Sequence, residues 1–518
     1  SMGIPTWVMV PFSPNWYFGA KENRTDWYPS MHLYRQRNYQ HWFPVTMAII
    51  NALSSRVATT PYKLIHPEQL CIQQAKKLFD EKKIQECIRY CNVMLKQYPR
   101  QTAFYFFLGI AAMALNDAEL AVSSLLVAEK VDTKNADIYT NLGTIFYRID
   151  ETDKAVFYFR KALELTPNNP ECLRNLAISC FELGFPEESL DLYRKAIKLK
   201  DSVENHFGYS LQLLGAGQYE EGWREYEYRL KMPQHNYTHL KLKSPMWDGS
   251  SLNDKTIFIC SEQGLGDNIQ FLRFIPLLKQ HYTCQIILGC SSNLLRIVKQ
   301  YEDIDIIICE NDLIPNHDYH LPIISLAMLF KIYNESQFMS HQPYIIPHLI
   351  LADYWKQVFA TNKKLKVGFC WAGSPQHVNN LRRNCDLFDF IKLSTLPNIK
   401  FYSLQRDYTE KERDLLSTSD IENLGDMFDD LADAAAAISQ LDLVLSIDSG
   451  LAHLAGAMGK KTWLIVPYYT EWRHQRNREY SPWYSSVKLY WQPAPGDWKS
   501  VFKQLEKDLI LLSTELSS

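Results

Sequence analysis

Residues 443–466 read LVLSIDSGLAHLAGAMGKKTWLIV, and this stretch decides the fold class of the C-terminal half of the chain. An apolar run rich in branched residues ends at Asp448, a turn of small residues follows, and an alanine-rich segment then leads to a second apolar run at 462–466. A strand, a turn, a helix and another strand in this order are typical of a parallel α/β unit.

The same alternation extends over the chain from residue 251 onward. Short β-rich runs occur at 256–260 (TIFIC), 285–289 (QIILG), 304–309 (IDIIIC), 366–371 (KVGFCW), 400–404 (KFYSL), 443–448 (LVLSID) and 462–466 (TWLIV). They fall into two groups that divide near 345–365, which predicts two Rossmann-like lobes facing one another. A ligand cleft is expected at the carboxyl ends of the strands.

A period of 34 residues runs from residue 68 to about residue 203. Small residues recur in one frame and large residues in another, which predicts helix pairs that cross at the small positions and fill their grooves with the large ones. The pattern resembles the tetratricopeptide repeat, most closely around 136–169, and such a solenoid presents a concave surface to a peptide or protein. The alternative is an array that only supports its neighbour. The recurring positions are Gly109, Gly143 and Ala177; Ala121, Ala155 and Ser189; Ala128, Ala162 and Ala196; and Leu125, Phe159 and Tyr193.

A second self-similarity joins the two ends of the sequence. Residues 3–42 align without a gap to residues 459–498, at a constant offset of 456. The N-terminal segment therefore reads as the tail of a preceding copy of the C-terminal lobe, either from a tandem array or from an old duplication. The matched residues include Gly3, Trp7, Trp16, Trp27 and Trp42, which meet Gly459, Trp463, Trp472, Trp483 and Trp498.

The predicted fold is therefore α + α/β, a helical solenoid followed by two Rossmann-like lobes. Residues 1–62 are expected to be the remnant, 66–235 the solenoid, 236–358 an N-terminal lobe on the acceptor side, and 359–518 a C-terminal lobe on the donor side.

Composition narrows the function classes. The chain has 518 residues and a net charge of -3, with lysines and arginines scattered, so a nucleic acid is not expected as a partner. Its 11 cysteines include no Cys-x-x-Cys pair, and Cys87 and Cys91 read as core residues rather than metal ligands. No run of 18 apolar residues and no signal-peptide pattern occurs, so we expect no transmembrane segment and a cytoplasmic location.

The run TIFIC leads directly into SEQGLGD at 261–267. Gly264 and Gly266 are expected to permit a tight turn from strand to helix, which places Asp267 at the helix start and facing the cleft. A carboxylate there either caps the helix or acts as the base that removes a proton from an acceptor hydroxyl. Both interpretations are open on spacing alone.

In the second lobe, the strand 443–448 is likewise followed by a turn of small residues and a helix start. Ser449 and Gly450 begin a helix whose free N–H groups and dipole favour a diphosphate, with Asp448 and Leu451 beside them. His453 lies one turn into the helix and is placed to donate a hydrogen bond to this ligand. The alternative for His453 is a buried histidine that pairs between helices.

A basic pair follows the strand 366–371 and its loop. Arg382 and Arg383 would neutralise a diphosphate leaving group without a metal, or would be an ordinary solvated pair. Trp371 and Ser374, on the strand end and in the loop, are further expected donor contacts. Gln405, at the end of the strand 400–404, is expected to contact the base or ribose.

Together, SLQLLGAGQYEEGWREYEYRL (210–230), SEQGLGDNIQFLRFIPLL (261–278) and SIDSGLAHLAGAMGKKTWLIV (446–466) resemble bacterial proteins that join tetratricopeptide repeats to a heptosyltransferase-like domain. Their plan is similar to that of the protein O-GlcNAc transferases, with repeats joined to a two-lobed GT-B enzyme. The resemblance implies that Asp267 is the base, that Asp448, Ser449, Gly450 and His453 hold the nucleotide diphosphate, and that Arg383 contacts phosphate. Ser449 stands where the family usually has Thr, and 379–384 read NNLRRN where it usually has Asn-Asp-x-x-Arg-Ser.

The sequence thus predicts an inverting, metal-independent glycosyltransferase that needs no cofactor. It would move a sugar from a nucleotide-diphosphate donor to an acceptor hydroxyl, with a protein or peptide on the repeat surface as the expected acceptor. The alternative is a non-catalytic repeat scaffold with a degenerate transferase-like domain. A dehydrogenase is disfavoured because no Gly-x-Gly-x-x-Gly follows a first strand.

Overall fold

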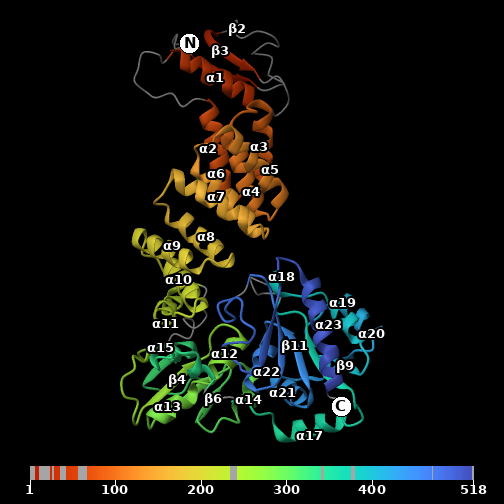
Figure 1. The fold of residues 1–518 in the computed structure, drawn as a ribbon. Coiled ribbons are helices and arrows are strands. Elements are labelled where there is room, and N and C mark those ends of the chain that lie inside the picture. Colours follow the sequence, from red (N-terminus) through yellow and green to blue (C-terminus); the bar gives the residue numbers. More distant parts are fainter. Residues whose placement is uncertain are drawn as a thin grey trace. The chain divides into compact units, whose positions relative to one another are not determined.

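The computed structural model describes residues 6–10, 24–25, 28–35, 42–56, 67–233, 242–339, 343–374, 380–469 and 471–515. The chain divides into two compact units, Ser1–Ile145 and Phe146–Ser518. The division falls inside the helical repeats, so the second unit holds the later repeats together with both α/β lobes (Figure 1).

The repeats form the predicted helix pairs. All the recurring positions are buried, which confirms the alternation of small and large residues. Gly109 shows the cause: a Cβ on this residue would lie 2.6 Å from Leu125 Cγ, so the crossing tolerates no side chain without displacing the partner. The helices are α2 (Pro67–Asp80), α3 (Ile84–Gln97), α4 (Thr102–Ala114), α5 (Ala118–Val131), α6 (Ala136–Arg148), α7 (Thr152–Leu165), α8 (Pro170–Glu182), α9 (Pro186–Leu199), α10 (Val203–Gly215) and α11 (Tyr219–Tyr226), followed by the 3-10 turn η2 (Glu227–Lys231).

The C-terminal lobe is built on a parallel sheet of strand order β10-β9-β8-β11-β12-β13. Numbered along this lobe, the order is 3-2-1-4-5-6, the Rossmann order, and its switch point lies between β8 and β11. The strands are β8 (Leu365–Cys370), β9 (Ile399–Ser403), β10 (Glu422–Asn423), β11 (Leu443–Ile447), β12 (Thr462–Val466) and β13 (Val487–Trp491); the helices are α18 (Asn380–Arg383), α19 (Leu387–Ser394), α20 (Glu410–Ser417), α21 (Leu431–Gln440), α22 (Gly450–Ala457) and α23 (Trp498–Glu515).

The N-terminal lobe has a smaller parallel sheet of order β6-β5-β4-β7. Three strands of the two lobes were not predicted from the sequence: β7 here, and β13 and the two-residue β10 in the other lobe. β7 is a four-residue edge strand that ends in Pro322, and β13 (VKLYW) carries a lysine that interrupts its apolar run. The elements are β4 (Thr256–Cys260), α12 (Leu265–Leu272), α13 (Ile275–His281), β5 (Gln285–Gly289), α14 (Leu295–Val298), β6 (Ile306–Ile308), β7 (Tyr319–Pro322), α15 (Leu326–Leu329), α16 (Glu335–Met339) and α17 (Leu349–Val358).

The N-terminal segment repeats part of the C-terminal sheet. β1 (Thr6–Val10) pairs in parallel with β3 (Tyr28–Arg35), and β2 (Arg24–Thr25) pairs antiparallel with β3. Thr6 faces Met31 as Thr462 faces Val487, which is the same register at the offset of 456. The bridge between Arg24 and His32 likewise repeats the bridge between Tyr480 and Lys488, and α1 (Phe43–Arg56) follows where α23 follows β13. The sequence match is therefore also a match of strand pairing.

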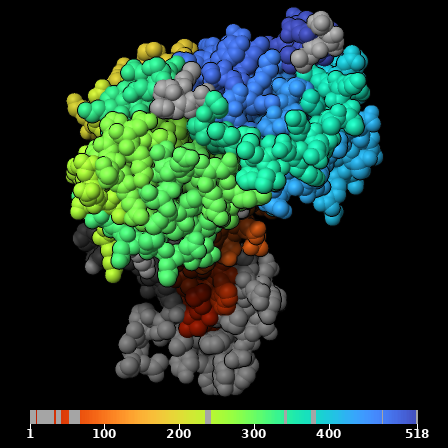
Figure 2. Space-filling view, turned by 90° about the horizontal axis from the view of Figure 1, so that it is seen from below, coloured from red at the N-terminus to blue at the C-terminus, as the bar shows by residue number. Residues whose placement is uncertain are grey.

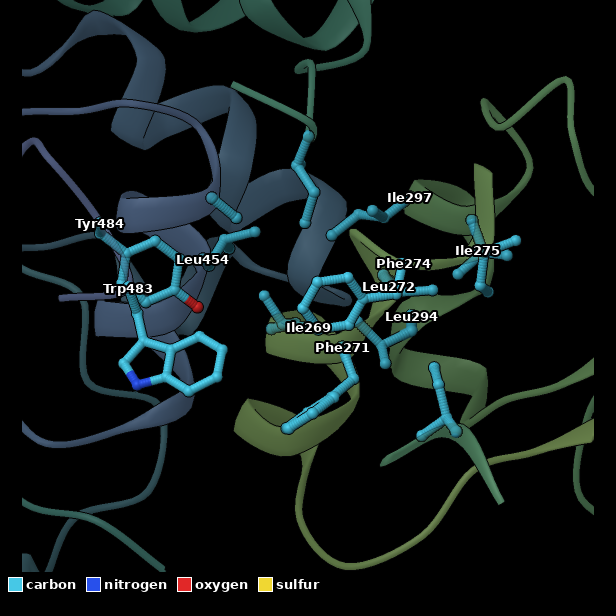
Figure 3. Close-up of a cluster of buried hydrophobic side chains, with 14 of the residues drawn as sticks. Ile269, Phe271, Leu272, Phe274, Ile275, Leu294, Ile297, Leu454, Trp483 and Tyr484 are labelled. Carbon is cyan, nitrogen blue, oxygen red and sulfur yellow. The ribbon is translucent and has the colours of Figure 1, made fainter. Parts of the chain in front are cut away.

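The two lobes share one hydrophobic core. Ile269, Phe271 and Leu272 from α12 pack toward Leu454 from α22 and toward Trp483 (Figure 3). Seen from below, the green N-terminal lobe and the blue C-terminal lobe lie directly side by side (Figure 2). This packing fixes α12 against α22, and so fixes the turns at which the two helices begin.

Phe159 and Phe157 on α7 provide a test of the repeat assignment. Phe159 is 1% exposed and Phe157 is 54% exposed. We expect Phe159→Ala to lower the free energy of unfolding by about 3–5 kcal/mol because it leaves a cavity. Phe157→Ala should change it by about 0.5 kcal/mol. Urea unfolding followed by circular dichroism measures both, and equal losses would contradict the assigned face of α7.

Candidate active site

The helices α12 and α22 begin beside one another, after β4 and β11. A Cβ on Gly266 would lie 2.7 Å from His453 Cδ2, and a Cβ on Gly450 would lie 3.9 Å from the Gly266 nitrogen. The two predicted turns therefore face each other. The reason given for the first glycine is corrected, because Gly264 has φ -93 while Gln263, at φ 58, adopts the left-handed conformation. Gly266 is needed for the close approach of the helices.

Asp267 is engaged on both carboxylate oxygens. Its Oδ2 accepts a hydrogen bond from the Gly264 N–H at 2.9 Å, which is the capping interaction, and its Oδ1 pairs with Arg473. Burial raises the pKa of Asp267, and the Arg473 guanidinium opposes this shift. The carboxylate is thus more basic than an exposed one and stands beside a fixed positive charge.

Arg473 and His474 fill the space between the two turns, and the sequence analysis missed both. Arg473 donates to Gln270 Oε1 at 2.9 Å and to Glu471 Oε2 at 2.7 Å, besides its pair with Asp267. His474 Nε2 lies 3.1 Å from Asp448 Oδ2, although neither ring nitrogen of His474 has hydrogen-bonding geometry to a described residue. The predicted crevice is therefore occupied by polar side chains. Apolar packing lies behind it.

The internal repeat does not single out these two positions. The copies aligned at the offset of 456 match at Trp16 and Trp472, yet the next residues are Tyr17 and Phe18 in the first copy. The C-terminal copy has Arg473 and His474 there. All ten aligned positions from 17 and 473 to 26 and 482 differ between the copies, so the internal repeat could not have revealed Arg473 and His474.

Asp448 and His453 complete a polar cluster that also contains Asp267, Arg473 and His474. Burial alone would raise the pKa of the Asp448 carboxyl, but His474, His453 and Arg473 hold it well below its usual range. His453 Nε2 lies 3.7 Å from Asp448 Oδ1, and His453 Nδ1 lies 2.9 Å from the Tyr484 hydroxyl. Burial lowers the pKa of His453 to about 3, so its ring is neutral at physiological pH. His453 is thus a buried, neutral histidine held by a tyrosine outside the helices and by a nearby aspartate, and its contact with a donor stays a prediction.

The start of α22 has the form of an anion site. Ser449 is the N-cap, and its hydroxyl accepts a 3.4 Å hydrogen bond from the Ala452 N–H. Gly450 opens the helix, and Leu451 packs partly buried against the shared core. The remaining first-turn N–H groups and the helix dipole favour an anion at this point.

The two arginines of α18 diverge. Arg383 donates from Nη1 to the Asp448 carbonyl at 3.1 Å, and a Cβ on Gly373 would lie 2.3 Å from Arg383 Nη2. Its Nε has no hydrogen-bond partner among the described residues. Arg382 instead binds the repeats, at Asp150 and Glu182. The pair is therefore not a solvated surface pair, and only Arg383 joins the cluster.

Three expected donor contacts lie outside the cluster or are already bonded. Trp371 is 1% exposed in the core of the C-terminal lobe, and its Nε1 donates to Glu412 at 2.6 Å, which is a correction to its predicted role. Gln405 is also buried: its Oε1 accepts from the Ala372 N–H at 3.2 Å, and its Nε2 donates to the Asp407 carbonyl at 3.0 Å. Gln405 thus joins two loop ends, and its amide is not open to a base or ribose. Ser374 is exposed and is the last described residue before 380.

A buried ion pair supports the loop before Asp267. Arg229, from η2, binds Glu262 through two hydrogen bonds of 2.8 and 2.7 Å, and it also reaches Glu227 at 2.6 Å. Despite the burial of Arg229, the carboxylates Glu262 and Glu227 raise its pKa above the usual value. The end of the repeats therefore holds the Glu-Gln-Gly loop, a link that sequence spacing does not reveal because 33 residues separate the partners.

Possible metal ligands, membrane-spanning helices and surface depressions among the described residues also bear on the site. No group of three or more metal-ligating side chains occurs in the part of the chain that the structure covers. Within the same ranges, no helix is long and apolar enough to cross a membrane. A surface depression of about 640 Å³ contains none of the predicted site residues; it is lined by Gln218, Tyr219, Glu220, Glu221, Arg224, Tyr333 and Asn334.

Comparison with known families agrees with this architecture. Residues 136–169 match the tetratricopeptide repeat, and residues 398–500 match glycosyltransferase family 9 (heptosyltransferase). The second match contains Asp448, His453 and the Arg473-His474 pair. The chain carries a family 9 glycosyltransferase domain joined to tetratricopeptide repeats. As the sequence predicted, it is a glycosyltransferase.

Relatives cover different shares of this glycosyltransferase. Protein FlbA of Caulobacter vibrioides is 23% identical over 437 residues, which are 75% of this chain and 70% of FlbA. The peroxisomal targeting signal receptor of Kluyveromyces lactis is 32% identical over 98 residues, or 19% of this chain and 17% of the receptor. Among solved structures, MamA is 22% identical and covers 30% of this chain and 92% of MamA, with a TM-score of 0.29.

The low pKa of His453 predicts a pH-dependent stability. As the pH falls below about 6.5, the unfolded chain takes up a proton on this residue and the folded chain does not, so stability falls by about 1.4 kcal/mol per pH unit until the folded pKa of about 3. In His453→Asn, the loss between about pH 6.5 and pH 5 should be smaller by about 2 kcal/mol. Urea unfolding at several pH values measures the slope. The exposed His281→Asn is the control and should keep the wild-type slope; an unchanged slope in His453→Asn would contradict the burial of a neutral ring.

Proposed function

We propose that this glycosyltransferase moves a sugar from a nucleotide-diphosphate donor to an acceptor hydroxyl by a single, inverting displacement that requires no metal. The observation that carries the proposal is the meeting of the two turns, which brings the Asp267 carboxylate beside a helix start suited to a diphosphate. Asp448, Ser449, Gly450 and Arg383 lie around that helix start.

The donor diphosphate would lie at the start of α22. The first-turn N–H groups and the dipole of α22 would meet its negative charge. Arg383 already lies at the Asp448 carbonyl, its Nε has no hydrogen-bond partner in the part of the chain that the structure describes, and its guanidinium is suited to two phosphate oxygens. These groups would stabilise the charge that develops on the departing nucleoside diphosphate. His453, which is neutral, would support Asp448 rather than supply charge.

Asp267 would act as the base across the cluster. The acceptor oxygen forms a bond to the anomeric carbon while the bond from that carbon to the diphosphate oxygen breaks. The acceptor proton passes to Asp267, and the electron pair leaves with the diphosphate. Burial raises the pKa of Asp267, which favours proton uptake, while Arg473 keeps the carboxylate ionised before the reaction.

The acceptor would be a protein or peptide bound by the repeats. Helical repeats of this type present a continuous concave face, and the later repeats belong to the same compact unit as the two lobes. The end of the repeats also binds the Glu262 loop that leads to Asp267. An acceptor bound to the repeats would thus lie on an element that is rigidly connected to the base.

Asp267→Asn tests the base. The amide keeps the capping oxygen but cannot take up a proton, so we expect kcat to fall about 10²–10⁴-fold with donor affinity unchanged. Transfer is measured by release of nucleoside diphosphate, and affinity by calorimetric titration with ADP-, GDP- and UDP-sugars.

Asp386→Asn is the matched control, since Asp386 is also an aspartate at a helix start and is exposed away from the cluster. It should retain full turnover. Wild-type turnover in Asp267→Asn would remove this residue from the mechanism. A wild-type protein that binds none of these nucleotide sugars would instead favour a scaffold role.

A further inference from the structure

Consecutive arginines on α18 connect two different parts of the second compact unit. Arg383 reaches the Asp448 carbonyl at the start of α22, whereas Arg382 reaches the turns of the helical repeats. Because both arginines lie in the single turn of α18, a shift of the backbone that carries Arg382 also shifts Arg383.

Arg382 is held by charge, by a carbonyl and by aromatic rings. Its Nη2 lies 2.6 Å from Asp150 Oδ1 and donates to the Tyr147 carbonyl at 3.2 Å, and its Nη1 donates to Glu182 Oε1 at 3.1 Å. The rings of Tyr147 and Tyr469 lie 5.1 Å from the guanidinium carbon, one from each side of the junction. The site thus has two carboxylates from two successive repeat turns for one arginine.

Glu182 makes this contact costly to break. Its side chain is 14% exposed, and its Oε1 also accepts from the Tyr147 hydroxyl at 2.6 Å. Burial raises the pKa of Glu182, and Arg382 acts against that shift. Without the arginine, a largely buried carboxylate would lose its cation, which is the costly way to break such a pair.

The same repeat turns also hold the loop of Arg473 and His474. Arg476 donates to the Glu182 carbonyl, and Gln475 Nε2 donates to the Tyr219 hydroxyl at 2.6 Å. The segment of Arg382 and Arg383 and the loop of Arg473 and His474 therefore both bind the turns that connect the helices of the later repeats. Their positions depend on each other through these turns.

We propose that Arg382 is a positioning residue, which fixes Arg383 at the donor diphosphate by clamping α18 to the repeat turns at Asp150 and Glu182. This inference rests on the proposed function, because it assigns a donor contact to Arg383. The repeats then do more than present an acceptor: they set the geometry of the donor site. A change in the repeat turns would alter donor affinity without any change in a residue that contacts the donor.

Arg382→Gln in the full chain tests the clamp. We expect the Kd of the nucleoside diphosphate that binds the wild type, chosen from ADP, GDP and UDP, to rise about tenfold, and the donor KM to rise in parallel. The kcat at saturating donor should change less than threefold, since no reacting group is removed. Arg382→Lys keeps one charge without the forked geometry and should recover part of the affinity.

Asp150→Asn provides a second variant on the repeat side. Asp150 has φ 62, which asparagine also tolerates, so this variant keeps the turn and loses only the charge. It should weaken diphosphate binding in the same direction as Arg382→Gln, and the double variant should be no weaker than Arg382→Gln alone. Arg160→Gln, which breaks the exposed pair with Glu188 on the same repeats, is the control and should bind as the wild type does.

The outcomes separate the two proposals. If Arg382→Gln and Asp150→Asn bind the nucleotide as tightly as the wild type while Arg383→Gln does not, the clamp is wrong and the donor site stands. If the wild type binds no nucleotide, the proposed function fails first. If affinity falls equally in Arg160→Gln, the effect belongs to the repeats in general, and the specific role of Arg382 is overturned.

Discussion

The site depends on one buried arginine that has no carboxylate partner among the described residues. Arg273, 1% exposed at the end of α12, donates to the carbonyls of Phe338 at 2.6 Å and Trp483 at 2.8 Å, and to the Tyr344 hydroxyl at 3.0 Å. A buried guanidinium is tolerated only where its N–H groups are satisfied, so these oxygens must stay in place for the lobes to pack. Because Trp483 belongs to the C-terminal lobe, α12 cannot shift relative to that lobe without exposing this charge to an apolar core. Asp267, at the other end of the same helix, is thereby held where Arg473 meets it.

The later repeats are part of the transferase unit rather than an appended arm. Arg229 supports the loop before Asp267, Arg382 supports the segment of Arg383, and Arg476 supports the loop of Arg473 and His474. In the first contact Arg229 reaches from the end of the repeats to a carboxylate of the lobe, whereas Arg382 and Arg476 reach from the C-terminal lobe to repeat turns. Packing of helix pairs therefore determines where the polar groups of the site lie, which accounts for a compact unit that begins at Phe146.

Patterns that are local in sequence predicted the fold well. The features that they did not predict depend on contacts between residues that lie far apart in sequence. The short apolar runs predicted the parallel strands because such strands are buried on both faces, and the period of 34 residues predicted the helix pairs because each repeat buries the same positions. They also gave the two turns, since strand ends and helix starts are local signals. Trp371 was misplaced because an indole at a strand end looks the same in sequence whether it points to a cleft or into a core. Arg473 was missed because its partner Asp267 lies 206 residues away, and no spacing rule covers such a pair.

The repeated N-terminal segment separates what the strand pairing requires from what the site requires. Its strands β1 and β3 keep the register of β12 and β13 at the pair Thr6–Met31, and its pair Arg24–His32 repeats the bridge Tyr480–Lys488, so the aromatic and apolar frame is sufficient for that pairing. The frame does not require Arg473 or His474, because the first copy has Tyr17 and Phe18 there. A cation at that position has a use only where a carboxylate such as Asp267 faces it and a second lobe encloses it. In the C-terminal copy, Arg473 and His474 lie in the polar cluster, where Asp267, Glu471 and Asp448 offset the cost of burying them.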